Sequence, residues 1–168
     1  ILARASTVEE ALEILEKEKI ALNKSHMLFG DSTGQAVIVE WVGGERKLHW
    51  IEDNKLVMTN FLLSEPEAGN YPDFRYKSII DRINELESGE QEINLNKIGN
   101  TVGLAVRPAR EDENKRLGGT VYVSFIDVTE NKFVLSYRLS NDDLVILDLE
   151  DEFAKSKRQT INFEKLFH

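Results

Sequence analysis

Short apolar segments separated by polar turns run from residue 26 to residue 60, and this pattern constrains the fold more than any other feature of the sequence. Four of these segments have the length of ordinary strands; they are residues 26–30, 35–42, 47–51 and 55–59. The turns at residues 31–34 and 43–44 contain glycine, which favours tight reversals of the chain. The region therefore predicts an antiparallel β-meander.

Two helices are predicted beside these strands. Thr7 and Glu10 have the spacing of a capping box, in which each side chain binds a backbone N–H of the first turn. Apolar residues recur at i, i+3, i+4 and i+7 from Val8, so one face of this helix is expected to be buried. A second helix is predicted over residues 74–86, and it is expected to end before Ser88-Gly89.

The second half of the chain predicts further strands. Residues 101–106, 120–128 and 132–139 are rich in apolar side chains. Thr129-Glu130-Asn131, between the last two segments, is typical of a hairpin turn. Residues 144–149 are expected to add another strand.

The order of these elements predicts an α+β fold. We expect the strands of residues 26–60 and 101–138 to form stacked antiparallel sheets, with a few helices beside them. The residues after Asp151 are expected to form a tail. No repeat, low-complexity tract or internal linker divides the chain.

The composition excludes several classes of function. The net charge is −9, from 21 basic and 30 acidic residues, and such a surface repels phosphate backbones and anionic lipids. We therefore expect neither a nucleic-acid partner nor a membrane partner. The chain has no cysteine, which excludes disulfides, thiolate metal sites and a cysteine nucleophile within these residues.

Several residues that can carry chemistry have simpler explanations here. His26, His49 and His168 lack metal-ligand spacing, so each is expected to have a structural role. Residues 30–34 contain glycines at both ends but lack the Lys-Ser/Thr ending of a phosphate loop. The four carboxylates within residues 148–152 do not have the spacing of a calcium loop, and a solvated edge is expected. We predict no metal ion and no cofactor.

Two polar residues stand out by their position. Asn60 ends an apolar segment and opens a loop that contains proline and glycine, where its side chain could donate N–H bonds into a cleft. Arg75 lies at the start of the predicted second helix, where the helix dipole does not favour a cation. Taken alone, Asn60 is also an ordinary turn residue and Arg75 an ordinary surface charge.

The order and spacing of several segments resemble the choloylglycine hydrolase family, which includes bile salt hydrolases and penicillin V acylases. Residues 26–34 have an H-x-L-x-x-D-x-x-G pattern and continue to Val37-Ile38-Val39-Glu40. Val57-Met58-Thr59-Asn60 resembles a family strand that ends in Thr-Asn. The resemblance also includes the first predicted helix and the late hairpin, and it extends over residues 1–139.

This resemblance implies an αββα sandwich like that of other N-terminal nucleophile hydrolases, with residues 1–168 as the C-terminal part of a single domain. It implies cleavage of a linear amide by an N-terminal cysteine, whose α-amino group acts as the base. Asn60 then corresponds to the oxyanion-site asparagine, and Arg75 to a late active-site arginine. The pattern departs at Phe74, where the family has a serine.

The family's cysteine, early arginine and early aspartate are expected to precede Ile1. A complementary N-terminal segment of the same protein is therefore one expected partner. The other is a small-molecule amide, such as a conjugated bile salt, penicillin V or a related N-acyl amide. A homo-oligomer is compatible with the family. Two alternatives stay open: acyl transfer on the same scaffold, and a non-catalytic binding module in which Asn60 and Arg75 are structural.

Overall fold

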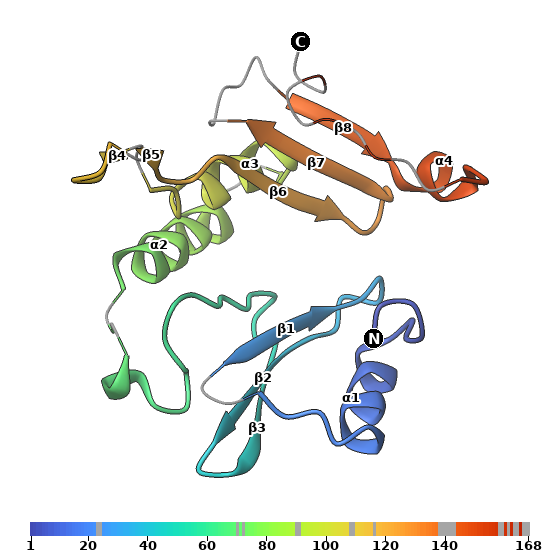
Figure 1. Cartoon of the computed structure of the whole chain (residues 1–168), viewed down its shortest axis with the longest axis vertical. Coiled ribbons are helices and arrows are strands. Elements are labelled where there is room, and N and C mark those ends of the chain that lie inside the picture. Colours follow the sequence, from blue (N-terminus) through green and yellow to red (C-terminus); the bar gives the residue numbers. More distant parts are fainter. Residues whose placement is uncertain are drawn as a thin grey trace. The chain divides into compact units, whose positions relative to one another are not determined.

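The computed structural model describes residues 1–22, 25–69, 71, 73–89, 92–107, 110–115, 117–137, 144–157, 160, 162 and 165. The chain divides into two compact units, Ile1–Glu87 and Ser88–His168. Each unit contains a three-stranded antiparallel sheet (Figure 1).

The sheet of the first unit has the strand order β1-β2-β3. Strands β1 (His26–Gly30), β2 (Ala36–Val42) and β3 (Glu45–Trp50) confirm the first three predicted strands. Helix α1 (Val8–Lys17) begins at Thr7, and both hydrogen bonds of the predicted capping box are present. The β1–β2 turn binds this helix, because the Asp31 carboxylate accepts the backbone N–H of Val8 at 2.9 Å.

Both faces of the central strand β2 are buried. One face packs against α1, as Figure 1 shows, and forms the core cluster; its buried members are Val8, Ala11, Leu15, Phe29, Val37 and Val39. Side chains alternate along a strand, so Ile38 and Glu40 face the other side, and both are 0% exposed. His26 is paired with Glu40, and His49 with Ile38, so both histidines share this second face.

The fourth predicted strand, residues 55–59, is wrong. The chain reverses at Asp53 and Asn54, which have φ values of 49° and 58°, and Glu52 and Lys55 form an isolated bridge there. The ammonium group of Lys55 then binds Asn84 at 3.1 Å and Glu87 at 2.8 Å. A helix therefore holds this segment through side chains, and no strand ladder extends along it in the described residues.

A loop and a helix complete the first unit. The loop contains a short 3₁₀ helix, η1 (Pro66–Ala68), and leads into α2 (Phe74–Ser88), which confirms the second predicted helix. Phe61 anchors the loop: it is 5% exposed, and its ring contacts those of Tyr71 and Tyr76 edge-on at 5.1 Å. Tyr76 belongs to α2, so the loop is packed against the first turn of that helix.

The sheet of the second unit has the strand order β6-β7-β8. Strands β6 (Tyr122–Asp127) and β7 (Lys132–Tyr137) form the predicted hairpin, and β8 (Leu144–Asp148) adds the predicted third strand. Residues 138 and 139 of the predicted strand lie outside the described residues. A separate two-stranded ladder joins β4 (Arg110–Glu111) to β5 (Leu117–Gly118).

We expected a tail after Asp151, but residues 152–154 belong to a helix, α4 (Leu149–Ala154). Asp148 starts this helix, because its carboxylate accepts the backbone N–H groups of Glu150 and Asp151. The same carboxylate pairs with Lys132 on the neighbouring strand. Part of the acidic stretch therefore caps a helix, and His168 lies outside the described residues.

The strand predicted at residues 101–106 is also wrong, because α3 (Leu95–Gly103) covers its first three residues. Asn94 caps this helix by accepting the backbone N–H of Lys97. Thr101 is 7% exposed, and its hydroxyl donates to the carbonyl of Lys97 one turn earlier. Gly99 lets α3 approach β6 closely, since a Cβ atom there would lie 3.3 Å from the Phe125 ring.

These elements confirm the α+β class and the antiparallel sheets. Stacking of the sheets into an αββα sandwich stays a prediction, as does the assignment of residues 1–168 to one domain. Among the described helices, none has the length and apolar character that a membrane span requires.

Candidate active site

Asn60 lies in a bend and its side chain is exposed. Two residues near it in the chain are more buried: Val57 is 9% exposed and Phe61, the next residue, is 5% exposed. The Asn60 side chain forms no hydrogen bond with any residue that the structure describes. Its amide group is therefore free to bind a ligand, while packing of the next residue, Phe61, fixes the backbone beside it.

Arg75 lies in the first turn of α2 and is bound to Asp73. Its Nε donates to Asp73 Oδ1 at 3.0 Å and its Nη2 to Asp73 Oδ2 at 2.6 Å, which is a bidentate ion pair. Asp73 also accepts the backbone N–H of Arg75 at 2.8 Å, as an N-cap residue does. The Phe74 ring lies 5.9 Å from the guanidinium carbon, and Phe74 is 62% exposed.

The ion pair shifts the pKa values of both groups. The hydrogen bond from Arg75 lowers the pKa of Asp73, and the same bond raises the pKa of Arg75. Both groups are therefore charged at neutral pH, and Asp73 compensates the charge of Arg75 at close range. Asn60 and Arg75 make no hydrogen bond with each other; within the described residues each is placed by a different set of contacts.

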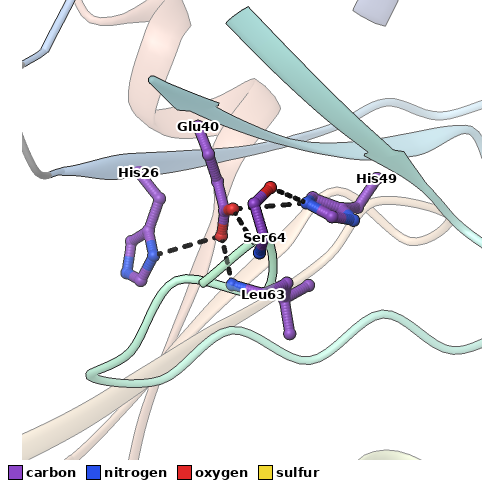
Figure 2. Close-up of polar contacts among 5 residues, drawn as sticks. All are labelled: His26, Glu40, His49, Leu63 and Ser64. Carbon is purple, nitrogen blue, oxygen red and sulfur yellow. Dashed lines mark hydrogen bonds and ion pairs between the residues drawn. The ribbon is translucent and has the colours of Figure 1, made fainter. Parts of the chain in front are cut away.

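A buried carboxylate on the second face of the sheet is the centre of a polar cluster that our sequence analysis did not predict (Figure 2). Glu40 Oε1 accepts the backbone N–H of Leu63 at 2.7 Å, and Oε2 accepts that of Ser64 at 2.9 Å. His49 Nε2 lies 3.2 Å from Oε2, and His26 Nδ1 lies 3.8 Å from Oε1. These five residues, His26, Glu40, His49, Leu63 and Ser64, are called the Glu40 cluster below.

The hydrogen bonds of this cluster keep Glu40 ionised. Burial acts to raise the pKa of Glu40, but the hydrogen bonds from Ser64 and Leu63 and the charge of His49 outweigh it. The net effect is a pKa below the ordinary value of 4.5. A fully buried carboxylate that stays charged is tolerated because each of its oxygens accepts a hydrogen bond from the loop.

The cluster does not have the geometry of a Ser-His-acid triad. His49 Nε2 contacts both Glu40 Oε2 at 3.2 Å and Ser64 Oγ at 2.9 Å. In a triad one imidazole nitrogen takes the proton of the hydroxyl, and the acid binds the N–H of the other nitrogen, which fixes the tautomer and stabilises the imidazolium. Here one nitrogen of His49 faces both Ser64 and Glu40, so Glu40 does not hold His49 in the tautomer that a triad requires. His26 Nδ1 is buried and has no hydrogen-bond partner among the described residues.

A cavity of about 440 Å³ lies beside this cluster within the first unit. Its lining is mostly apolar, with the Lys55 and His49 side chains among the polar groups. Neither Asn60 nor Arg75 lines it. No group of three or more His, Cys, Asp or Glu residues in the described part of the chain is arranged to hold a metal ion.

Comparison with known proteins gives the class of fold. No family model and no curated protein matches the sequence. Among solved structures, the penicillin V acylase from Agrobacterium tumefaciens is similar with a TM-score of 0.62 and 17% identity. Two structures of conjugated bile acid hydrolase variants from Clostridium perfringens are similar with TM-scores of 0.60 and 0.62, at 14% and 16% identity. The resemblance to the choloylglycine hydrolase family is thus confirmed at the level of the fold.

The coverage of these matches is unequal. They include 87%, 88% and 90% of this chain, but only 52%, 59% and 60% of the respective solved structures. The chain therefore spans between half and three fifths of the length of these proteins. At such identities the likeness concerns the fold, and an activity has to be argued from the site.

Proposed function

We propose that this chain supplies Asn60 and Arg75 to the active site of an enzyme that hydrolyses a linear amide bond. The substrate class is a conjugated bile salt, penicillin V or a related N-acyl amide. The observation that carries the proposal is the exposed side-chain amide of Asn60, which bonds to no described residue, at the start of an anchored loop. The fold is similar to that of two amide hydrolases.

The chemistry of Asn60 fits an oxyanion site. Attack on an amide carbonyl converts its oxygen into an oxyanion, and donors already in place stabilise that charge without reorganising. A side-chain amide provides such N–H donors without adding a charge of its own. The buried neighbour Phe61 restrains the backbone, so the donor does not have to be ordered during the reaction.

Arg75 contributes directed hydrogen bonds more than free positive charge. Two of its three nitrogens are bound to Asp73, which fixes the plane of the guanidinium group. The remaining nitrogen, Nη1, donates to no described residue. In the proposed enzyme this nitrogen faces the negative charge that develops near the nucleophile.

The nucleophile belongs to a complementary segment of the same protein in this proposal. It is a cysteine at a mature N-terminus, where its α-amino group accepts the thiol proton near neutral pH. The thiolate attacks the amide carbonyl, Asn60 donates to the oxyanion, and the amine leaves before water releases the acyl group. No step requires a metal ion or a cofactor.

The test uses the complete protein that contains this chain and follows release of a chromogenic amine. Asn60→Ala is expected to lower kcat on the order of 100-fold or more, because one oxyanion donor is lost. The melting temperature should stay unchanged, since the side chain is exposed. Asn114→Ala, at another exposed asparagine, is the matched control and should turn over at the wild-type rate.

The same assay separates the alternatives. Wild-type turnover by Asn60→Ala contradicts the proposed role of this residue. If the wild-type protein transfers the acyl group to an added amine in preference to water, it is an acyltransferase. Saturable amide binding with no turnover in the complete protein identifies a non-catalytic binding module.

A further inference from the structure

Residues 60–65, at the start of the loop that follows Asn60, belong to no strand or helix that could satisfy their backbone. A hydrogen bond from the Glu65 N–H to the Leu62 carbonyl at 3.2 Å closes a turn over residues 62–65. The two central N–H groups of this turn, those of Leu63 and Ser64, point instead to Glu40. Consecutive backbone N–H groups of a turn form a concave donor pair that suits a carboxylate.

Burial of Glu40 makes this contact specific. A fully buried carboxylate loses its hydration, and this loss costs several kcal/mol unless hydrogen bonds replace it. Two of the replacing donors come from the loop, at 2.7 and 2.9 Å, so Glu40 and the loop must keep one relative position. Any shift of the loop takes two hydrogen-bond donors away from the carboxylate and leaves the two backbone N–H groups without this acceptor.

A second contact fixes the loop closer to Asn60. Gly69 approaches Phe61 so closely that a Cβ atom on the glycine would lie 2.7 Å from the Phe61 Cβ. The Phe61 ring also contacts Tyr71 and Tyr76 at 5.1 Å. The backbone is therefore held at residue 61 by packing and at residues 63 and 64 by Glu40, whereas the side chain of Asn60 stays exposed.

We propose that Glu40 is a positioning residue for Asn60: it holds the turn after Asn60 through the backbone N–H groups of Leu63 and Ser64. This proposal rests on the oxyanion role proposed for Asn60. Glu40 touches neither substrate nor nucleophile in this scheme, and it acts only through the conformation of residues 60–64. Its loss should therefore reduce kcat with little change in KM, since an oxyanion donor acts in the transition state.

A double-mutant cycle in the complete protein tests this. Glu40→Gln keeps the size of the side chain and removes one acceptor. It is expected to lower kcat by about 10-fold or more in the wild-type background, because a donor displaced by about 1 Å loses most of its effect. In the Asn60→Ala background the same substitution should change kcat by no more than about 2-fold, which is the usual error of additivity. Glu45→Gln, an exposed glutamate on the neighbouring strand, is the control.

The outcomes distinguish the two proposals. If Asn60→Ala has wild-type kcat, the oxyanion role itself is wrong. If Asn60→Ala is impaired but Glu40→Gln costs the same factor in both backgrounds, Glu40 affects stability or another group, and the positioning proposal alone is overturned. A cost that disappears in the Asn60→Ala background supports it.

Amide hydrogen exchange of the wild-type protein keeps the proposal testable if Glu40→Gln does not fold. The Leu63 and Ser64 amides should exchange as slowly as amides within the ladder of β1 and β2 at neutral pH. Exchange as fast as that of the exposed turn residue Asp53 would overturn the proposal, because the turn would then not be held.

Discussion

The substitution Glu40→Gln removes one charge from the interior of the first unit and leaves the shape of the side chain almost unchanged. Glu40 is 0% exposed, so the variant cannot replace lost contacts with water unless the loop moves. Its effect on the free energy of unfolding therefore measures how strongly the Glu40 cluster holds the loop. This measurement does not depend on any proposed activity.

The magnitude follows from the two hydrogen bonds of the carboxylate. In the wild type, one oxygen accepts from Leu63 at 2.7 Å and the other from Ser64 at 2.9 Å. A glutamine offers one carbonyl oxygen and an NH₂ group, so one buried backbone N–H loses its acceptor, at a cost of about 1–3 kcal/mol. Relief of charge burial opposes this cost, but the lowered pKa of Glu40 shows that the interactions outweigh burial. We expect a net loss of about 2 kcal/mol.

The pH dependence gives the sign of the effect. The pKa of Glu40 is lowered in the folded state, so its contribution is complete above the ordinary value of 4.5 and is lost as the pH falls through the folded-state pKa. Protonated Glu40 resembles glutamine in charge and shape. The stability gap between the wild type and Glu40→Gln should therefore close as the pH falls through the folded-state pKa of Glu40. His26 and His49 are the other titratable side chains that face this carboxylate.

Urea unfolding followed by far-UV circular dichroism measures the gap at several pH values. The m-value should be the same for both proteins, which shows that the difference lies in stability and not in compactness. Glu45→Gln is the control, because the Glu45 carboxylate pairs with Lys47 at the surface, where solvent screens the interaction. A gap below about 0.5 kcal/mol at neutral pH would refute the reasoning, since exposed substitutions give as much. A gap that does not close in acid would refute it as well.

Two further predictions concern the helices. Arg75→Lys should lower kcat by about 10-fold or more in the complete protein, because an ammonium group cannot reproduce the bidentate contact with Asp73. Arg82→Lys, later in the same helix, is the control. Equal kcat values for the two variants would contradict the prediction. Leu15→Ala should reduce the free energy of unfolding by about 2–5 kcal/mol, because Leu15 is 1% exposed in the core between α1 and the sheet. Calorimetry or urea unfolding checks this value, and a loss no larger than that of Leu2→Ala, at a residue 91% exposed, would show that α1 is not packed as described.

The parts of the fold that the sequence predicted correctly are those with local signals. The capping box of Thr7 and Glu10, the β1–β2 turn and the β6–β7 hairpin each depend on residues a few positions apart. The two wrong strands failed for a different reason. Residues 55–59 and 101–106 are rich in apolar and β-branched side chains, but a strand also needs a ladder partner, and neither segment has one among the described residues.

The candidate site was predictable only in part. Asp73 directly precedes the predicted second helix, where an N-cap aspartate is favoured, but this pattern does not indicate its ion pair with Arg75. Glu40 had a weaker signal, as a single charge in the apolar run of β2. Its partners could not be inferred, since His49, Leu63 and Ser64 follow it by 9, 23 and 24 residues. The structural expectation for His26 and His49 missed that both face the same carboxylate.

A buried charge is not needed to make β2 stable, because an apolar residue of similar size would extend the buried face without any loss of hydration. Such a residue could not, however, accept the N–H groups of Leu63 and Ser64. The turn would then have to open until both groups reached water, and many conformations of residues 60–64 satisfy that condition. A carboxylate whose two oxygens are fixed allows essentially one conformation of these residues. The function of Glu40 is therefore to specify the conformation of the turn, and the residue whose position this conformation decides is Asn60.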